Sequence, residues 1–299
     1  WAQTTWSQQP LMQRETRGVP PNVMLTLEDS SSMLFQHLPE DKLVIGPYTV
    51  THPLINKSVR FHPSDTLTHA ATFAGTVTAV SGSSNWRQKF MRSAQTNWTF
   101  YNPEVRYQPW PVAAGGRMSA YPATAAPLDP MNPAVTVNLT LKKSITDANE
   151  LWCFRTNTQT NCAKTTSAVS FDPGLYYVLK TTLGTAADPA VATNYTEYSI
   201  STGSTFPKSA ARTDCTGTTC TLAQEQQNFS NWFTYHRSRA LMVKGAMAEA
   251  FVNQGADFRL GWGRINQSVS RSIDGVSSTV IESGVRDFNQ ANFFNWLYA

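Results

Sequence analysis

Charged residues are scarce in this chain. Asp, Glu, Lys and Arg make up only 15% of its 299 residues, against about 25% in an ordinary globular domain. No cluster of Lys and Arg accompanies the formal charge of +4, so the sequence lacks the electrostatic footprint of a nucleic-acid-binding protein. Abundant Ser, Thr, Asn and Gln take the place of the charges, which favours a secreted protein over a cytosolic enzyme.

Long hydrophobic runs are also missing. No apolar run reaches the roughly 18 residues that a helix needs to cross a bilayer, so we expect no transmembrane segment. The sequence starts at Trp1 without an initiator Met or a signal peptide, and we interpret it as a processed mature chain. Hydrophobic residues still account for 41% of the chain, enough to bury the core of one large or two ordinary domains.

Motifs of catalysis are absent as well. The sequence contains no G-x-S-x-G elbow, no G-x-x-x-x-G-K-[ST] loop and no G-x-G-x-x-G turn. Its five histidines are scattered without metal-ligand spacing, and we interpret them as structural or exposed: His37, His52, His62, His69 and His236. We therefore expect that the protein is not an enzyme.

Cysteines are few and fall into two local pairs, Cys153 with Cys162 and Cys215 with Cys220. Both pairs close short loops rich in Thr and Asn, without the C-x-x-C spacing or nearby His of a zinc site. Two local disulfides are the economical interpretation, and they imply an oxidising compartment. Four unrelated free thiols are the alternative.

The first 220 residues favour strands and loops. Residues 1–21 contain the doublet Pro20-Pro21 and are predicted to form an extended arm. The apolar run at 23–27 has the pattern of a buried central strand. Further strands are predicted within a segment rich in Pro, Gly, Asn and Ser, at 135–141, 175–179 and 195–200. Residues 34–220 are thus predicted to be a β-rich insertion after the first strand.

A helical pattern begins near residue 221. Thr221 and Gln224 have the spacing of a capping box, and apolar residues then recur every three or four positions up to Phe251. Strands are predicted at 258–265 and 276–281, and a second helix at 289–298. This order predicts a parallel α/β sheet whose core is discontinuous and comprises residues 22–33 and 221–299.

The loop after the first strand combines carboxylates with hydroxyls. Open α/β sheets bind ligands at the carboxyl ends of their strands, and hard oxygen ligands suit magnesium or calcium. In one register the ligands are Glu28, Ser30 and Ser32; the register shifted by one residue starts at Asp29 and ends at Met33, which is not a hard ligand. The alternative is a polar turn whose side chains satisfy backbone groups.

Four stretches of the sequence resemble the PilC/PilY family of type IV pilus assembly and adhesion proteins. They lie in family order at 20–33, which reads PPNVMLTLEDSSSM, and at 92–110, 212–239 and 293–298. The resemblance implies a von Willebrand A-like core, doubly wound with a mostly parallel sheet and incomplete at its C-terminal end. The metal site of such cores reads D-x-S-x-S. Glu28 stands where that pattern has aspartate, so the resemblance implies a degenerate Mg or Ca site.

The same resemblance implies where the protein acts. It implies an exported protein that passes through the periplasm to the cell surface and sits at the pilus tip. There it would associate with minor pilins, assist pilus assembly or counteract retraction, and contact host cells or abiotic surfaces. The alternative is a secreted lectin-like module without a pilus role. Its aromatic clusters at 98–101 and 107–110 would bind glycans, although such residues are more often core.

Overall fold

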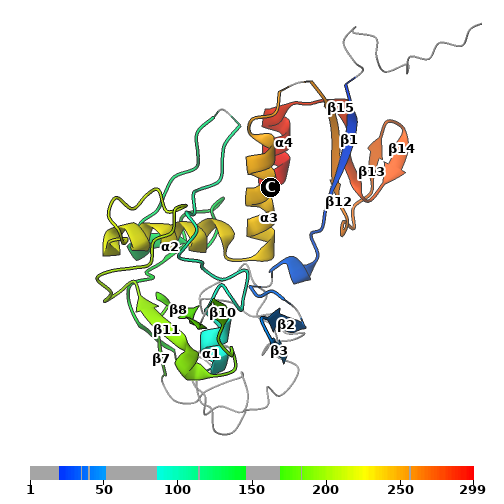
Figure 1. The fold of residues 1–299 in the computed structure, drawn as a ribbon. Helices are drawn as coiled ribbons and strands as arrows, with labels where there is room; N and C mark the ends of the chain where they lie inside the picture. The colour runs from blue at the N-terminus through cyan, green and yellow to red at the C-terminus, as the bar shows by residue number, and fades with distance from the viewer. Residues whose placement is uncertain are drawn as a thin grey trace, which may run out of the picture.

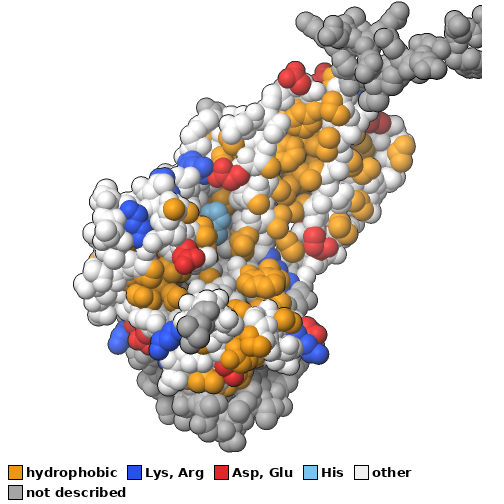
Figure 2. Space-filling model, viewed as in Figure 1, with side chains coloured by type: hydrophobic (Ala, Val, Ile, Leu, Met, Phe, Trp, Pro, Cys, Tyr) orange, Lys and Arg blue, Asp and Glu red, His pale blue; other side chains and the backbone are white. Residues whose placement is uncertain are grey.

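The computed structural model describes residues 20–34, 36–39, 41–51, 86–113, 115–145, 169–182, 184–255 and 257–299. These residues form two regions, one around a three-stranded sheet with two helices and one around helix α2 with several two-stranded pairs (Figure 1). Within these ranges, no helix has the length and apolar character required to cross a membrane. On the face drawn in Figure 2, charged side chains of both signs are few and scattered.

The larger sheet has the order β1-β12-β15, formed by Asn22–Leu27, Arg259–Arg264 and Ile281–Asp287. β1 runs parallel to β12, with Asn22 opposite Arg259, whereas β15 is antiparallel to β12. This combination of helices and a mixed sheet agrees with the predicted α/β class. The doubly wound, von Willebrand A-like arrangement stays a prediction, and so do the domain boundaries.

Strand β1 differs from the buried central strand that its apolar sequence predicts. Within the described part of the chain only β12 pairs with it, so β1 forms an edge of the sheet. Val23 and Met24 are consequently 39% and 42% exposed. Leu25 and Leu27 instead contribute to the core that the sheet shares with helices α3 (Arg239–Phe251) and α4 (Gln290–Tyr298).

Two glycines in β12 permit a close crossing of the chain. A Cβ atom at Gly263 would lie 1.9 Å from the carbonyl oxygen of Val280, and one at Gly261 would lie 2.7 Å from Met24 Sδ. Neither position leaves room for a side chain. The chain entering β15 can therefore pass directly over β12, where the register between the two strands shifts.

The single helix predicted from 221 to 251 is wrong, because the structure has two helices, α2 (Leu222–His236) and α3 (Arg239–Phe251), which point in different directions (Figure 1). Ser238 has an extended backbone, and its hydroxyl accepts a hydrogen bond from the Leu241 N–H as the N-cap of α3. The predicted capping box is confirmed at the start of α2, where Thr221 and Gln224 each bond the other's backbone N–H.

The C-terminal segment contains helix α4 (Gln290–Tyr298), which confirms the helix predicted from residue 289. The strand predicted at 276–281 is instead split between a hairpin and β15. Strands β13 (Arg271–Ile273) and β14 (Val276–Ser278) form the hairpin. The Ser278 hydroxyl accepts from the Val280 and Ile281 N–H groups, which turns the chain before β15 begins.

The other region consists of short pairs of strands around α2. The strand predicted at 135–141 shrinks to Thr136–Val137, because Asn138 Oδ1 accepts from the Thr140 N–H and starts a turn. The strands predicted near 175 and 195 are confirmed. The remaining elements are β2 (Lys42–Ile45), β3 (Tyr48–Thr51), α1 (Trp86–Met91), β4 (Ala126–Pro127), β5 (Thr136–Val137), β6 (Lys143–Ile145), β7 (Val169–Phe171), β8 (Leu175–Leu179), β9 (Thr181–Thr182), β10 (Thr185–Ala186) and β11 (Tyr195–Ser199), with 3-10 turns at Ser31–Leu34, Ala123–Ala125 and Ala192–Asn194.

Most of the aromatic residues singled out in the sequence belong to the interior. Phe100 and Tyr101 are buried in a cluster with Phe229 and Trp232 of α2. Trp110 is buried in the cluster that includes α3 and α4. Trp98, in contrast, is 56% exposed. The core interpretation therefore holds for the larger part of both aromatic segments.

Candidate functional site

The loop that follows β1 borders a cavity of about 460 Å³. Three loop residues line this cavity, namely Glu28, Asp29 and Ser30, together with Lys244 of α3, Arg264 of β12 and Asn266. The loop leads directly into the 3-10 turn Ser31–Leu34, so the parallel strand and this tight turn position the loop side chains.

The structure brings the three residues of the first register together. Ser30 Oγ lies 2.9 Å from Ser32 Oγ, and Glu28 Oε1 accepts a hydrogen bond of 2.7 Å from the Ser30 N–H. Hydrogen bonds from the side chain and backbone of Ser30 lower the pKa of the exposed Glu28 carboxyl group. The Glu28 carboxylate thus acts within its own turn.

Asp29, the acid of the other register, points to a different part of the chain. Its Oδ1 accepts from the Asn266 N–H at 2.8 Å, and its Oδ2 accepts from Gln267 Nε2 at 2.6 Å. The Met33 N–H closes the turn on the Ser30 carbonyl at 3.0 Å. These bonds tie the loop to the residues after β12, which is the polar-turn role considered for this sequence.

The donor set does not fit a dedicated magnesium or calcium site. Such ions take six to eight oxygen ligands in proteins, and the loop offers one exposed carboxylate and two hydroxyls. Lys244 and Arg264 line the same cavity, and their positive charges oppose a cation. Within the described ranges, no group of three or more His, Cys, Asp or Glu residues could hold a metal ion.

The two cations of the cavity have structural partners that the sequence did not reveal. Lys244 Nζ donates to the Ala299 carbonyl at 3.2 Å, and Arg264 Nη2 donates to the Trp296 carbonyl at 2.7 Å. Both satisfy carbonyls at the C-terminal end of α4, where positive charge is favourable. Burial, followed by the charge of Arg264, lowers the pKa of Lys244.

A second polar cluster, centred on the Arg212–Glu225 ion pair, lies in the interior. Both side chains are completely buried, and Arg212 Nη1 lies 2.9 Å from Glu225 Oε2. The other carboxylate oxygen of Glu225 accepts from the hydroxyls of Tyr101 at 2.8 Å and Tyr176 at 2.7 Å. Burial, followed by the charge of Glu225, raises the pKa of both tyrosines, so both hydroxyls remain protonated donors.

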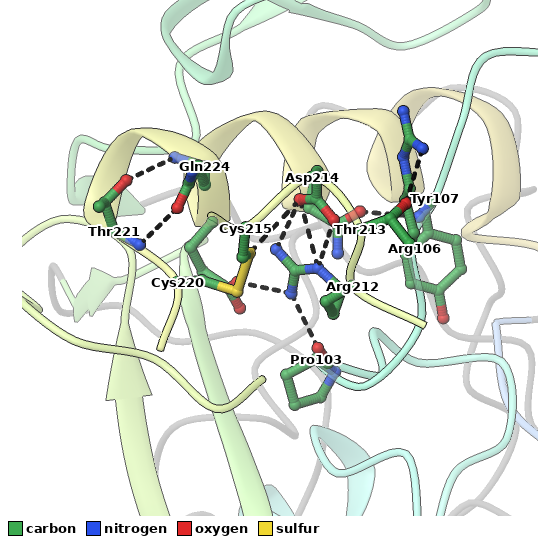
Figure 3. A network of polar contacts seen from close by, with 12 residues as sticks. Pro103, Arg106, Tyr107, Arg212, Thr213, Asp214, Cys215, Cys220, Thr221 and Gln224 are labelled. Carbon is green, nitrogen blue, oxygen red and sulfur yellow. Dashed lines mark hydrogen bonds and ion pairs between the residues drawn. A yellow bond between two sulfur atoms is a disulfide. The ribbon is translucent and has the colours of Figure 1, made fainter. Parts of the chain in front are cut away.

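Figure 3 shows the surroundings of Arg212. Its guanidinium pairs with Asp214 at 3.0 Å and donates to the Pro103 carbonyl at 2.8 Å. The Cys215–Cys220 disulfide lies beside this pair and confirms the predicted bond. Cys153 and Cys162 lie outside the described residues, so the second disulfide stays a prediction. The cluster fixes the chain near residue 103 and the disulfide loop against α2.

The two histidines within the described residues are structural. Burial, followed by the charge of Arg239, lowers the pKa of His37 to about 4. Burial also lowers the pKa of His236, whose Nε2 lies 2.9 Å from the Gln108 carbonyl. Both side chains are therefore neutral at pH 7. His52, His62 and His69 lie outside the described residues.

No family model matches the chain, and no solved structure matches it. Curated relatives do match, namely the type IV pilus biogenesis factor PilY1 of three Pseudomonas aeruginosa strains. Identity is 27% over 302 residues for strain UCBPP-PA14, 25% over 305 for PAO1 and 26% over 308 for PAK. Each match covers 97% of this chain and 20% of the relative, so the chain spans about a fifth of these proteins. Similarity over nearly the whole length of the chain confirms its resemblance to the PilC/PilY family of type IV pilus proteins.

Proposed function

We propose that the chain belongs to a type IV pilus biogenesis factor that acts at the pilus tip without enzymatic activity. The observation that carries this proposal is the similarity to PilY1, a protein named for type IV pilus biogenesis, across 97% of the chain. The matched region is a fifth of PilY1, so the role of the whole relative comes to this chain as a proposal.

In this proposal the protein is exported through the periplasm to the cell surface. It associates with minor pilins, assists pilus assembly or counteracts retraction, and contacts host cells or abiotic surfaces. The Cys215–Cys220 disulfide supports export, because such bonds persist in oxidising compartments. The scarcity of charged residues supports it as well.

Deletion of the gene that encodes the chain tests the pilus role. We expect surface pili and surface motility to be lost, and both to return when the gene is restored. A second deletion, of the motor that retracts pili, separates the two possible roles. Pili that reappear in the double mutant indicate a protein that counteracts retraction, whereas continued absence indicates assembly. Normal piliation in the single mutant would overturn the proposal.

Association with minor pilins needs its own experiment. Crosslinking on intact piliated cells, followed by purification of the protein, is expected to recover minor pilins in fixed proportion. The control is the same procedure on cells that lack the minor pilins. A protein that crosslinks only to the major pilin, or remains monomeric and free of pilins at high concentration, contradicts this partner assignment.

For the loop after β1, we propose that Glu28, Ser30 and Ser32 bind magnesium or calcium weakly or not at all. The exposure of Glu28 and the nearby cations support this proposal. Calorimetric titration of the chain with each ion is expected to show no submicromolar binding. The matched control for Glu28→Ala is Glu104→Ala, at another exposed carboxylate. Submicromolar binding that only Glu28→Ala abolishes would prove the proposal wrong.

A further inference from the structure

A second cavity of about 460 Å³ lies between residues 106–109 and the first half of α2, and it shares no residue with the cavity beside β1. Its helical wall is one face of α2, because the four amide residues on it recur every three or four positions. They are Gln224, Gln227, Asn228 and Asn231. The opposite wall is the segment 106–109, and its residue Arg106 lies beside Thr213 and Asp214 (Figure 3).

Two of the four amides hold the opposite wall in place. Asn228 Nδ2 donates to the Val105 carbonyl at 2.8 Å, and its Oδ1 accepts from the Tyr107 N–H at 2.7 Å. Asn231 Nδ2 donates to the Tyr107 carbonyl at 3.0 Å. Both main-chain groups of Tyr107 are therefore already bonded, and Pro109 has no N–H to offer a docking peptide.

The other amides keep unused hydrogen-bonding groups. Among the described residues, the Gln108 side chain has no hydrogen-bond partner, and Gln224 uses only its Oε1, which accepts from the Thr221 N–H. Gln227 uses only its Nε2, which donates to the Tyr121 carbonyl and to Asn231 Oδ1. The cavity thus offers uncharged donors and acceptors side by side.

The charges of the cavity balance. Arg106 and Asp214 both line it, and they carry opposite signs. Arg106 Nη1 donates to the Thr213 hydroxyl at 2.9 Å, while Asp214 pairs with the buried Arg212. No excess of either sign is available to attract a phosphorylated or acidic ligand. The partner that suits this wall chemistry is neutral.

We propose that this cavity binds a neutral glycan, about one or two sugar rings in size. Its free amides match hydroxyl groups, which both donate and accept hydrogen bonds. Pro109, Ala120 and Ala223 also line the cavity and supply apolar surface for the C–H face of a sugar. The inference does not depend on the pilus role.

The proposal is tested by titrating the full 299-residue chain with lactose, maltose and chitobiose. Saturation-transfer NMR detects the binding of each sugar. At least one of these neutral disaccharides is expected to bind saturably. Gln108→Ala, which removes an amide that holds no internal bond, should raise its Kd about tenfold. Ala223→Trp should abolish binding by filling the cavity from an exposed position. Gln254→Ala, at an exposed amide beyond the C-terminal end of α3, is the control and should leave the Kd unchanged.

Three results overturn the proposal. They are no binding of any of the three disaccharides, binding that survives Gln108→Ala unchanged, and tighter binding of sialyllactose or trialanine than of the neutral sugars. Gln108→Ala keeps the test decisive if Ala223→Trp does not fold. Piliation of cells that carry Gln108→Ala should stay normal, so failure of sugar binding and failure of the pilus role are distinguishable.

Discussion

Two Arg–Glu pairs in this chain differ in how far water reaches them. Arg212 and Glu225 are completely buried, whereas the side chains of Arg117 and Glu249 are 33% and 50% exposed. In the interior, each charge depends on its partner, because neither can be solvated. At the surface, water replaces a lost partner at little cost.

Removal of one partner should therefore lower the free energy of unfolding more for the buried pair than for the surface pair. We expect Arg212→Ala to lower the free energy of unfolding by about 3–5 kcal/mol, since it leaves the Glu225 carboxylate buried with only hydroxyl donors. Arg117→Ala, its matched control, should cost about 0–1 kcal/mol. Urea unfolding followed by tryptophan fluorescence measures both. Equal costs for the two variants would contradict the assigned role of the buried cluster.

His37 should make stability depend on pH. Burial holds its pKa at about 4 in the folded chain, well below the ordinary value of 6.5, so the unfolded chain takes up a proton first as the pH falls. The free energy of unfolding should therefore decrease between about pH 6.5 and 4, by roughly 3 kcal/mol at most. Urea titrations at several pH values test this. His37→Gln should flatten the profile in that window, and an unchanged slope counts against the assignment.

Some residues of the loop site could be predicted from the sequence, and others could not. Glu28, Ser30 and Ser32 follow one another at intervals of two positions along the chain, so their proximity could be predicted from spacing alone. Lys244 and Arg264 come from α3 and β12, and only the tertiary fold places them beside the loop. The buried pair of Arg212 and Glu225 carried no motif that would have identified it.

Among the elements, the junction of α2 and α3 is the clearest departure from prediction. The apolar periodicity continues through residues 236–240, so it could not reveal that the chain turns there. The local signal is Ser238, which is a good N-cap residue and a poorer residue for a helix interior. Periodicity predicted the two helical segments well, whereas the N-cap at Ser238 marks the break between them.

Substitution of that N-cap residue tests its contribution. Ser238→Ala removes the acceptor for the Leu241 N–H, and we expect it to lower the free energy of unfolding by about 1 kcal/mol. Ser238→Gly, which tolerates the N-cap backbone, should cost only a few tenths of a kcal/mol. Thermal unfolding measured by circular dichroism distinguishes them. If the Ser238→Ala variant is as stable as the chain with Ser238, tertiary packing alone determines where α2 ends and α3 begins.

Strands illustrate a different limit of prediction. The sequence of β1 predicts burial on both faces, whereas the described sheet leaves Val23 and Met24 exposed at an edge. Strand order depends on which distant segments pair, and no local pattern encodes that choice. The parallel β1–β12 pairing agrees with the parallel sheet that was predicted from the order of a strand, a long helical segment and further strands.

For the molecule as a whole, the sheet region depends on contacts between the two ends of the chain. Leu260 of β12 is completely buried in the cluster that contains Leu27 and helices α3 and α4. We expect Leu260→Ala to cost about 2–5 kcal/mol and to raise amide hydrogen exchange in residues 22–27. Val276→Ala, at a residue 68% exposed, is the control and should change neither. Faster exchange at 259–264 with full protection at 22–27 would contradict this coupling.

The parallel alignment of Asn22 with Arg259 has a consequence for how the protein is made. The first strand leaves the ribosome, and passes any export channel, with 237 positions still to come before its partner strand. Contacts so far apart in sequence close slowly, since a long intervening chain has to be ordered first. The apolar run of β1 must therefore remain unpaired and free of aggregation until β12, Arg259–Arg264, has been delivered. Pairing of β1 with β12 is consequently a late event compared with the synthesis of β1.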